Sequence, residues 1–364
     1  MVRPRGGRLW CPGAAAVLLP VAIVNILFLL YGTSPRALLA PFEADRRLRY
    51  GDMLEVSSST VAFDFAGEFR RQASARPARP HQTRPGDAPR GWSFPFVSGD
   101  VFRLASDFIF DETDASDMWT GADVRPCDVV FVKSCRFADF RARIRPDITA
   151  PFILVSHNSD ASLPGDTPAD PLVFRWFAQN LDRPGGRLRP IPIGIENMQW
   201  PGGNVTRWIE RLSAPIRPWD DRDLLLFVAW SDATNARRRE WKRLLANFST
   251  DVVVAGGLSR DEYLAGLGRA KFVASPPGNG VDCHRTWEAV LMGAVPVVLA
   301  SALDDLHLAG PVVIVDDYAD LTEPALRRIR PSSRYTRDVV WANTWLAKVH
   351  RAVQQCRDRN MVDF

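Results

Sequence analysis

The stretch KFVASPPGNGVDCHRTWEAVLMGAVPVVL, residues 271–299, indicates the fold most directly. It opens with a short apolar strand, passes through a loop rich in proline and glycine, and enters a helix that begins near Asp282 to Arg285. Gly293 suits the position just beyond the end of that helix, and a second apolar strand follows it. This order of strand, loop, helix and strand is typical of a parallel sheet covered by helices.

Short apolar runs of the same kind recur on both sides of this stretch, at residues 129–132, 152–155, 191–195, 224–229, 252–255, 272–274, 295–299 and 312–315. Amphipathic stretches at 237–248, 260–270 and 286–292 lie between the later runs. The spacing breaks at 201–221, which is rich in Pro, Gly and Trp, so we expect a hinge there. The pattern predicts an α/β protein with two Rossmann-like halves.

The N-terminal region carries a candidate membrane anchor. Residues 14–31 are almost entirely apolar and would span roughly 27 Å as a helix, close to the thickness of a bilayer core. Arg3, Arg5 and Arg8 precede this run, which favours a cytosolic N-terminus and a lumenal body. The alternative is a cleaved signal peptide, whose apolar stretch is usually shorter.

These features divide the chain into six predicted parts. Residues 1–13 form a cytosolic tail, 14–31 a transmembrane signal-anchor, and 32–91 a stem that is rich in Arg, Pro, Ala and Gly toward its end. Residues 92–205 form an N-terminal Rossmann-like domain, and 206–330 form a C-terminal Rossmann-like domain. Residues 331–364 hold a last helix, expected over 338–356, that packs back on the body.

The distribution of charge argues against a nucleic-acid-binding protein. Residues 1–90 hold 13 Arg and no Lys against 7 acidic residues, a net charge of +6, whereas the remaining 33 basic and 35 acidic residues give −2. The excess of positive charge therefore lies in the N-terminal region, and no basic stripe is evident in the folded part.

Cysteines and sequons fit a lumenal body without a structural metal. Cys11 precedes the apolar run, and Cys127, Cys135, Cys283 and Cys356 allow up to two disulfides whose pairing the sequence leaves open. Sequons begin at Asn204 and Asn247. No CxxC motif or close Cys/His quartet suggests zinc, and we expect no bound metal or cofactor.

The loop and helix of residues 275–288 have the chemistry of a phosphate site. A glycine-containing loop before a helix N-terminus offers free N–H groups and the positive end of a helix dipole. Arg285 suits a diphosphate and Glu288, three residues on, suits the hydroxyls of a ribose. The alternative is an ordinary turn followed by a surface ion pair. The candidate donor-binding residues here are Ser275, Gly278, Asn279, Gly280, His284, Arg285 and Glu288.

A second loop, SDATNARRR at 231–239, follows the apolar run at 224–229 and opens another helix. Ser231, Asn235, Arg237 and Arg238 could converge on the same diphosphate. The alternative is a capped helix with a solvated arginine face. No spaced pair of acidic residues follows a strand here, so a metal-bridged donor is not expected.

The block FVASPPGNGVDCHRTWEAVLMGAVPVVL resembles the donor-binding region of exostosin-like glycosyltransferases. Residues 156–160 (SHNSD), 176–180 (WFAQN) and 190–197 (PIPIGIEN) are also similar to that family, and the resemblance covers roughly residues 100–320. It implies two facing Rossmann-like domains, the arrangement called GT-B, with an acceptor domain at 92–205 and a nucleotide-sugar domain at 206–330. It also implies inversion at the anomeric carbon and generally no bound metal.

An inverting transfer needs a general base, which we expect from loops after strands of the N-terminal half. His157, Asp160 and Glu196 meet this description, and Glu196 is the preferred candidate. His157 could instead hold an acceptor hydroxyl, and a lone His beside a strand is more often structural.

The predicted function is transfer of a sugar, from a UDP-sugar by family default, to a hydroxyl of a glycan or glycoprotein acceptor in the secretory pathway, with a Golgi type II topology. Two alternatives remain: a fucosyl- or sialyltransferase-like enzyme using another nucleotide, such as GDP-fucose, and a non-catalytic lumenal lectin or scaffold.

Overall fold

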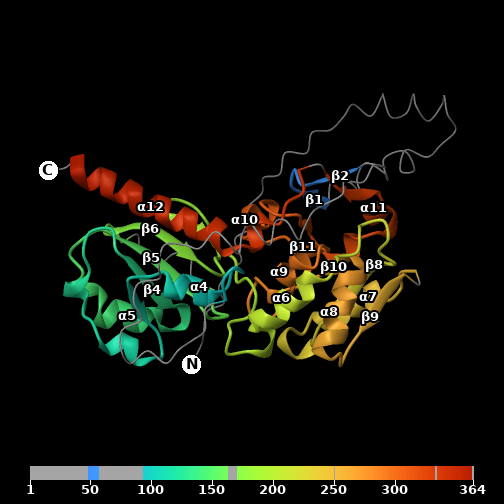
Figure 1. Ribbon diagram of the computed structural model, residues 1–364, viewed down its shortest axis with the longest axis horizontal. Helices are drawn as coiled ribbons and strands as arrows, with labels where there is room; N and C mark the ends of the chain where they lie inside the picture. The colour runs from blue at the N-terminus through green and yellow to red at the C-terminus, as the bar shows by residue number, and fades with distance from the viewer. Residues whose placement is uncertain (1–47, 57–92, 163–169, 250, 333, 363–364) are drawn as a thin grey trace, which may run out of the picture. The chain divides into compact units, whose positions relative to one another are not determined.

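The computed structural model describes residues 48–56, 93–162, 170–249, 251–332 and 334–362. The predicted anchor at 14–31 lies outside these residues. Among the described helices, none is both long and apolar enough to cross a bilayer. The prediction of a mixed α/β fold with parallel sheets is confirmed (Figure 1).

The N-terminal half is built on a five-stranded, fully parallel sheet with strand order β3-β4-β5-β6-β7. The strands are β3 (Phe108–Phe110), β4 (Val129–Lys133), β5 (Phe152–His157), β6 (Val173–Ala178) and β7 (Leu188–Pro190). Helix α4 (Gly99–Leu104) contacts β5, and α5 (Phe137–Arg143) contacts β4. Every side chain of β5 is buried, as expected for a strand covered on both faces.

The C-terminal half holds a six-stranded sheet with order β1-β12-β11-β10-β8-β9. Strands β8 (Leu224–Ala229), β9 (Val252–Ala255), β10 (Ala270–Ala274), β11 (Val295–Leu299) and β12 (Val313–Val315) are parallel. The helices between them are α7 (Arg238–Leu245), α8 (Arg260–Arg269), α9 (His284–Leu291) and α10 (Asp304–Leu308). All five of these strands match apolar runs of the sequence within two residues.

Two short strands come from the region assigned to the stem. Strand β1 (Leu48–Tyr50) pairs antiparallel with β12, and β2 (Leu54–Val56) pairs antiparallel with β13 (Ile329–Pro331). Leu48 and Leu54 are buried in the core of the C-terminal half. The stem prediction is therefore wrong for residues 48–56. These residues pair with strands of the C-terminal half, and Leu48 and Leu54 pack in its apolar core.

The run at 191–195 is not a strand, contrary to the sequence pattern. Gly194 adopts a positive φ of 70°, and a Cβ there would lie 2.1 Å from the carbonyl oxygen of Val97. The Ile195 N–H donates to that same oxygen at 2.9 Å. The segment is apolar because Ile191, Ile193 and Ile195 are buried, not because it extends a sheet.

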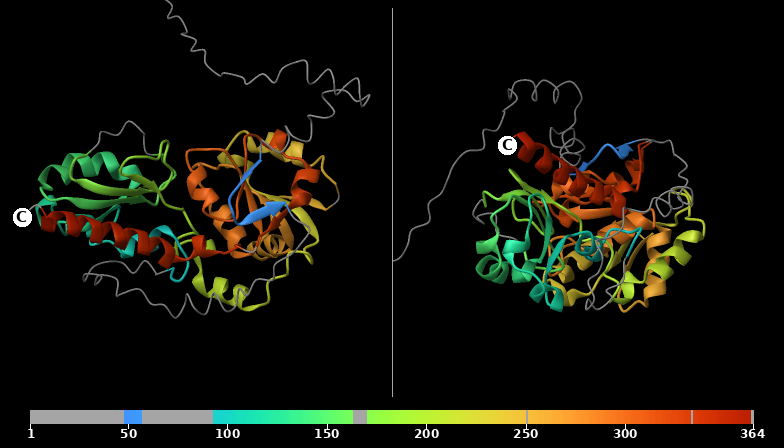
Figure 2. Two further views of the ribbon diagram at one scale, coloured as in Figure 1. Left: turned by 90° about the horizontal axis from the view of Figure 1, so that it is seen from above. Right: turned by 60° about the vertical axis from the view of Figure 1, so that its left-hand side comes forward.

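The expected hinge at 201–221 contains α6 (Val205–Ser213), with Trp208 and Leu212 buried. The last helix, α12 (Ala342–Val362), begins four residues later and runs further than expected. It packs on β5 and β6 of the N-terminal half, as Figure 2 shows from above. The predicted packing of this helix on the body of the protein therefore includes packing on the sheet of the N-terminal half.

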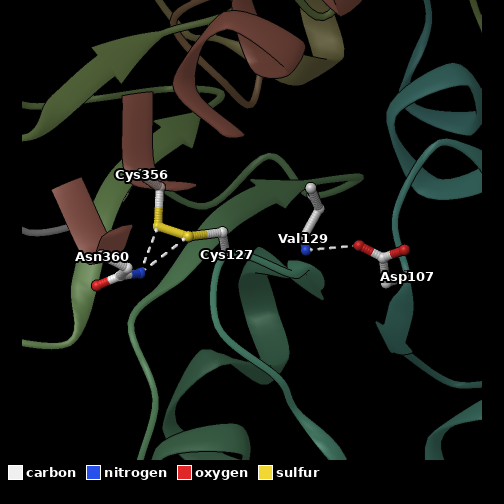
Figure 3. The surroundings of a disulfide bond; sticks show 5 residues. All are labelled: Asp107, Cys127, Val129, Cys356 and Asn360. Carbon is white, nitrogen blue, oxygen red and sulfur yellow. Dashed lines mark hydrogen bonds between the residues drawn. A yellow bond between two sulfur atoms is a disulfide. The ribbon is translucent and has the colours of Figure 1, made fainter. Parts of the chain in front are cut away.

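A disulfide fixes the far end of α12. Cys127, which precedes β4, is bonded to Cys356, and Asn360 Nδ2 lies 3.2 Å from Cys127 Sγ (Figure 3). The Val129 N–H donates to Asp107 at 2.8 Å beside it. Cys135 and Cys283 are free. One bond therefore forms among the four cysteines in the described residues.

Candidate active site

The carboxyl ends of β8 and β10 form a topological switch point. From β8 the chain goes to the edge strand β9, and it then returns to β10 on the opposite side of β8. The loops after β8 and β10 therefore leave in opposite directions from the edge of the sheet formed by the carboxyl ends of the strands. Open parallel sheets bind their ligands at this edge. The two loops singled out in the sequence, 231–237 and 275–283, are these loops.

A cavity of about 520 Å³ opens at this edge. This volume lies within the range of small-molecule and cofactor sites. Its walls come from the loops after β8 and β9 together with α7 and α8, and they comprise Ala229, Trp230, Ser231, Asp232, Lys242, Ala255, Gly256, Gly257, Leu258 and Tyr263. The loop that sequence analysis proposed to face the base, 256–259, thus contributes three residues to the wall.

Arg285 contacts two residues of the cavity wall, Ala229 and Trp230. Its Nε donates to the carbonyl oxygen of Ala229 at 2.9 Å, and its guanidinium carbon lies 5.8 Å from the ring centroid of Trp230. Its Nη1 is buried and has no hydrogen-bond partner among the described residues. A buried donor without an acceptor is costly, so an acceptor from an ordered water or a ligand is expected at this atom.

Glu288 is buried, with 3% of its surface exposed, and is held from two sides. Arg260 Nη2 lies 2.7 Å from its Oε1, and the Tyr263 hydroxyl donates to its Oε2 at 2.8 Å. Burial and the charge of Glu288 raise the pKa of Tyr263, which keeps that hydroxyl a donor. Each carboxylate oxygen still has a second acceptor site. Glu288 is therefore a fixed acceptor next to the cavity wall.

Arg238 joins the two loops to each other. It is buried, and it donates to the carbonyl oxygens of Pro277 at 2.9 Å, Ser231 at 3.0 Å and Pro276 at 3.1 Å. A Cβ on Gly278 would lie 3.0 Å from its Nη2, so the loop passes close to the guanidinium. Arg238 thus positions the loops and does not extend toward a ligand.

The other polar residues of the first loop form local contacts. Arg237 is exposed and forms an ion pair with Asp317 at 2.7 Å. The Asn235 side chain accepts from the Arg237 N–H, and the Ser231 side chain accepts from the Ala233 N–H. These contacts fit the alternative stated from the sequence, in which this segment is a capped helix with a solvated arginine face. The structure does not bring Arg237 and Asn235 to the cavity wall.

The second loop faces the N-terminal half. Asn279 donates to Asp160 at 3.2 Å, and a Cβ on Gly280 would lie 2.6 Å from Asn180 Nδ2. The Ser275 and Thr286 hydroxyls, which are buried, lie 2.9 Å apart and tie the loop to α9. Asn279 and Gly280 thus lie where the two halves meet.

Sequence analysis overlooked Asp282, which is the main polar link between the halves. Its side chain accepts from the Ile193 N–H at 2.7 Å and from Trp287 Nε1 at 2.9 Å. Its own N–H donates to Asn180 Oδ1 at 2.9 Å. The available signal in the sequence was an acidic residue directly before a helix. Its partners in the N-terminal half, Ile193 and Asn180, lie 89 and 102 residues away in the sequence, so the sequence did not indicate them.

His284 also reaches across to the N-terminal half. Its Nδ1 lies 2.8 Å from the carbonyl oxygen of Gly194. A carbonyl only accepts, so Nδ1 carries the proton, and in the neutral ring Nε2 is left as an acceptor.

The three candidate bases lie in different surroundings. His157 is buried, its Nε2 lies 3.0 Å from the Pro192 carbonyl oxygen, and its Nδ1 accepts from the Asn158 N–H at 2.7 Å. Burial lowers the pKa of His157 to about 4. With both nitrogens engaged, His157 fits the structural role that the sequence left open.

Asp160 and Glu196 are more accessible than His157. Asp160 is exposed, and among the described residues its side chain accepts from Asn279. Glu196 accepts from the Gly202 N–H at 2.8 Å, and a Cβ on Gly202 would lie close to both Glu196 Oε2 and Arg260 Nη2. Glu196 and Glu288 thus approach the same guanidinium from opposite halves.

Two further findings bear on the site. Within the described residues, no group of three or more His, Cys, Asp or Glu side chains is placed to hold a metal ion. No protein-family model matches the chain, and no curated protein matches it in sequence.

Proposed function

We propose that the chain is an inverting glycosyltransferase of the GT-B arrangement that binds a nucleotide sugar in its C-terminal half. The observation that carries this proposal is Arg285, whose buried Nη1 has no partner among the described residues and whose guanidinium lies against Trp230, a residue of the cavity wall. The proposal includes a membrane anchor at residues 14–31 and a lumenal body.

The donor would lie across the edge of the sheet. The nucleoside occupies the 520 Å³ cavity, with its base against Gly256–Leu258 and its ribose toward Glu288. The diphosphate accepts hydrogen bonds from Arg285 and from the N–H groups at the start of α9, where the helix dipole adds positive charge. The sugar then extends toward Asn279 and His284, between the two halves.

The transfer itself is a single displacement. The acceptor hydroxyl oxygen forms a bond to the anomeric carbon while the bond from that carbon to the phosphate oxygen breaks, and the nucleoside diphosphate leaves. Asp160 takes the hydroxyl proton, because it is the exposed carboxylate that touches the donor loop through Asn279. Glu196, preferred from sequence, instead positions Arg260 against Glu288.

Binding of nucleotides by the full chain in detergent tests the donor site. Isothermal titration with UDP, GDP and CMP, each with and without Mn²⁺, is expected to identify one tight ligand. Arg285→Ala should weaken that ligand about tenfold or more, since a charge-assisted hydrogen bond is lost. Arg239→Ala, an exposed arginine on α7, is the matched control and should bind as the wild type does. Equal affinity in both variants, or no nucleotide bound by the folded protein, would contradict the proposal.

A further inference from the structure

A second, basic cavity lies on the N-terminal half. It has a volume of about 310 Å³ and lies between β6–β7 and α12, with α10 at one side. Four cations line it: Arg175, Arg189, Lys348 and Arg351. We call this cavity and its four cations the basic groove. Its walls share no residue with the cavity beside Arg285.

The positive charge of the basic groove is not neutralised by neighbouring residues. None of the four cations forms an ion pair with a described residue, and Asp305 is the only carboxylate among the described residues that line the groove. Arg189 donates to the carbonyl oxygens of Gly186 and Leu188, and the Lys348 ammonium lies 3.8 Å from the ring centroid of Trp345. Neither contact supplies a negative charge.

Two of the cations also repel their neighbours. Burial lowers the pKa of Arg175, and the nearby charges of Arg189, Arg359 and Arg187 lower it further. Burial and then Arg351 lower the pKa of Lys348. Like charges around a hollow raise the free energy of the unliganded protein, and an anion in the hollow would remove that cost.

We propose that the basic groove binds a sulfate or phosphate ester group carried by a larger ligand. The ester oxygens match the forked donors of Arg175, Arg189 and Arg351. The hollow shape suits a discrete group, and the lining residues include no exposed large aromatic side chain on which a nucleic-acid base could stack. This site is additional to the proposed donor site and does not depend on it.

Calorimetric titration of the full chain in detergent tests the site directly. The probes are glucose 6-sulfate, glucose 6-phosphate, inorganic sulfate, inorganic phosphate and glucose. We expect at least one ester to bind at least tenfold more tightly than glucose and than its own inorganic ion. The ester that binds more tightly identifies which of the two groups the site takes.

Two double variants that change the net charge equally distinguish a specific binding site from nonspecific electrostatic attraction of the ester. K348Q/R351Q removes two cations of the basic groove, and we expect it to weaken the ester about tenfold or more. R207Q/R357Q removes two exposed arginines outside the groove and should bind as the wild type does. Both should unfold at or above the wild-type temperature, because neither breaks an ion pair among the described residues.

Three results would overturn the proposal. In the first, no ester binds better than glucose. In the second, the two double variants lose affinity equally, which indicates diffuse attraction. In the third, inorganic sulfate or phosphate binds as tightly as the esters, which indicates an adventitious ion only.

Discussion

Glu288 is the residue on which both the stability of the C-terminal half and the proposed donor site depend. Its carboxylate is buried and compensates Arg260, which is only partly exposed. Removing the charge takes away the carboxylate that pairs with the partly buried Arg260 guanidinium and leaves Glu196 as its nearby negative charge. We expect Glu288→Gln to lower the free energy of unfolding by about 2–3 kcal/mol.

Urea denaturation checks this value, and Glu240→Gln, an exposed acidic residue on α7, serves as the control. Glu288→Gln should also weaken nucleotide binding, because the carboxylate proposed to accept hydrogen bonds from the ribose hydroxyls is lost. Wild-type stability in Glu288→Gln would show that the pair with Arg260 contributes little.

His157 gives the protein a predictable response to acid. Its folded pKa of about 4 lies below the usual value near 6.5, so between these two pH values the unfolded chain binds more protons than the folded chain. The stabilising contribution of neutral His157 is complete above pH 6.5 and is lost as the pH falls through 4. The expected slope from this residue is at most about 1.4 kcal/mol per pH unit.

Unfolding measured from pH 7 to pH 4 checks this expectation. In His157→Gln the slope should be smaller, since a glutamine amide can donate to Pro192 and does not titrate. His350→Gln, an exposed histidine, should keep the wild-type slope. An unchanged slope in His157→Gln would show that other groups cause the acid sensitivity.

At the residue level, the sequence predicted some roles and not others. The position of Arg285 at the start of a helix after a glycine loop was predicted from the sequence, and its binding of a diphosphate stays a prediction. The neighbouring arginines Arg237 and Arg238 could not be told apart, although one pairs with Asp317 and the other binds three loop carbonyls. Their partners lie on other loops, and a single sequence does not give the distances between loops.

At the level of the elements, α12 depends on a single covalent link. The Cys127–Cys356 bond spans 229 residues of sequence and joins the end of the chain to the start of β4. Replacing both cysteines with serine should lower the free energy of unfolding by about 2–5 kcal/mol, chiefly because the unfolded chain gains freedom. Hydrogen exchange should increase first in α12.

Cys135→Ser provides the control, because Cys135 is exposed and free. Its unfolding and its exchange should match the wild type. If the double cysteine variant were as stable as the wild type, the packing of α12 on β5 and β6 alone would hold the helix.

The strands with the simplest patterns were the ones that the sequence predicted. Strands β4, β8 and β11 are continuous apolar runs, and they were predicted within two residues. Strand β6 was missed because Arg175 interrupts it, and β1 and β2 were missed because three-residue strands give no periodicity. The basic groove was overlooked because its cations come from two segments, 175–189 and 348–351, that lie far apart in the sequence. The prediction that the folded part lacks a basic stripe for nucleic acid concerned an extended surface and did not address a compact cluster of four cations.

At the level of the whole molecule, the account rests on two parallel sheets whose loops share one site. Asp282, Asn279 and His284 bind backbone or side chains of the N-terminal half, so the helix that begins the proposed phosphate site also contacts the proposed acceptor half. The sequence predicted both α/β halves and the position of the loop between β10 and α9, and donor binding by that loop stays a prediction. It could not predict these contacts, because they depend on how residues far apart in the chain meet.

The most direct test of the central claim is turnover by the full chain in detergent. Release of nucleoside diphosphate is measured from a panel of UDP-, GDP- and CMP-sugars, with a mixture of glycan acceptors and with or without EDTA; for CMP-sugars the released species is CMP. The account predicts release from one donor class that requires the acceptor mixture, persists in EDTA, and is lost in Arg285→Ala and in Asp160→Asn but not in Arg239→Ala. A protein that binds a nucleotide yet releases none from any donor would contradict the account and would favour a lectin or scaffold.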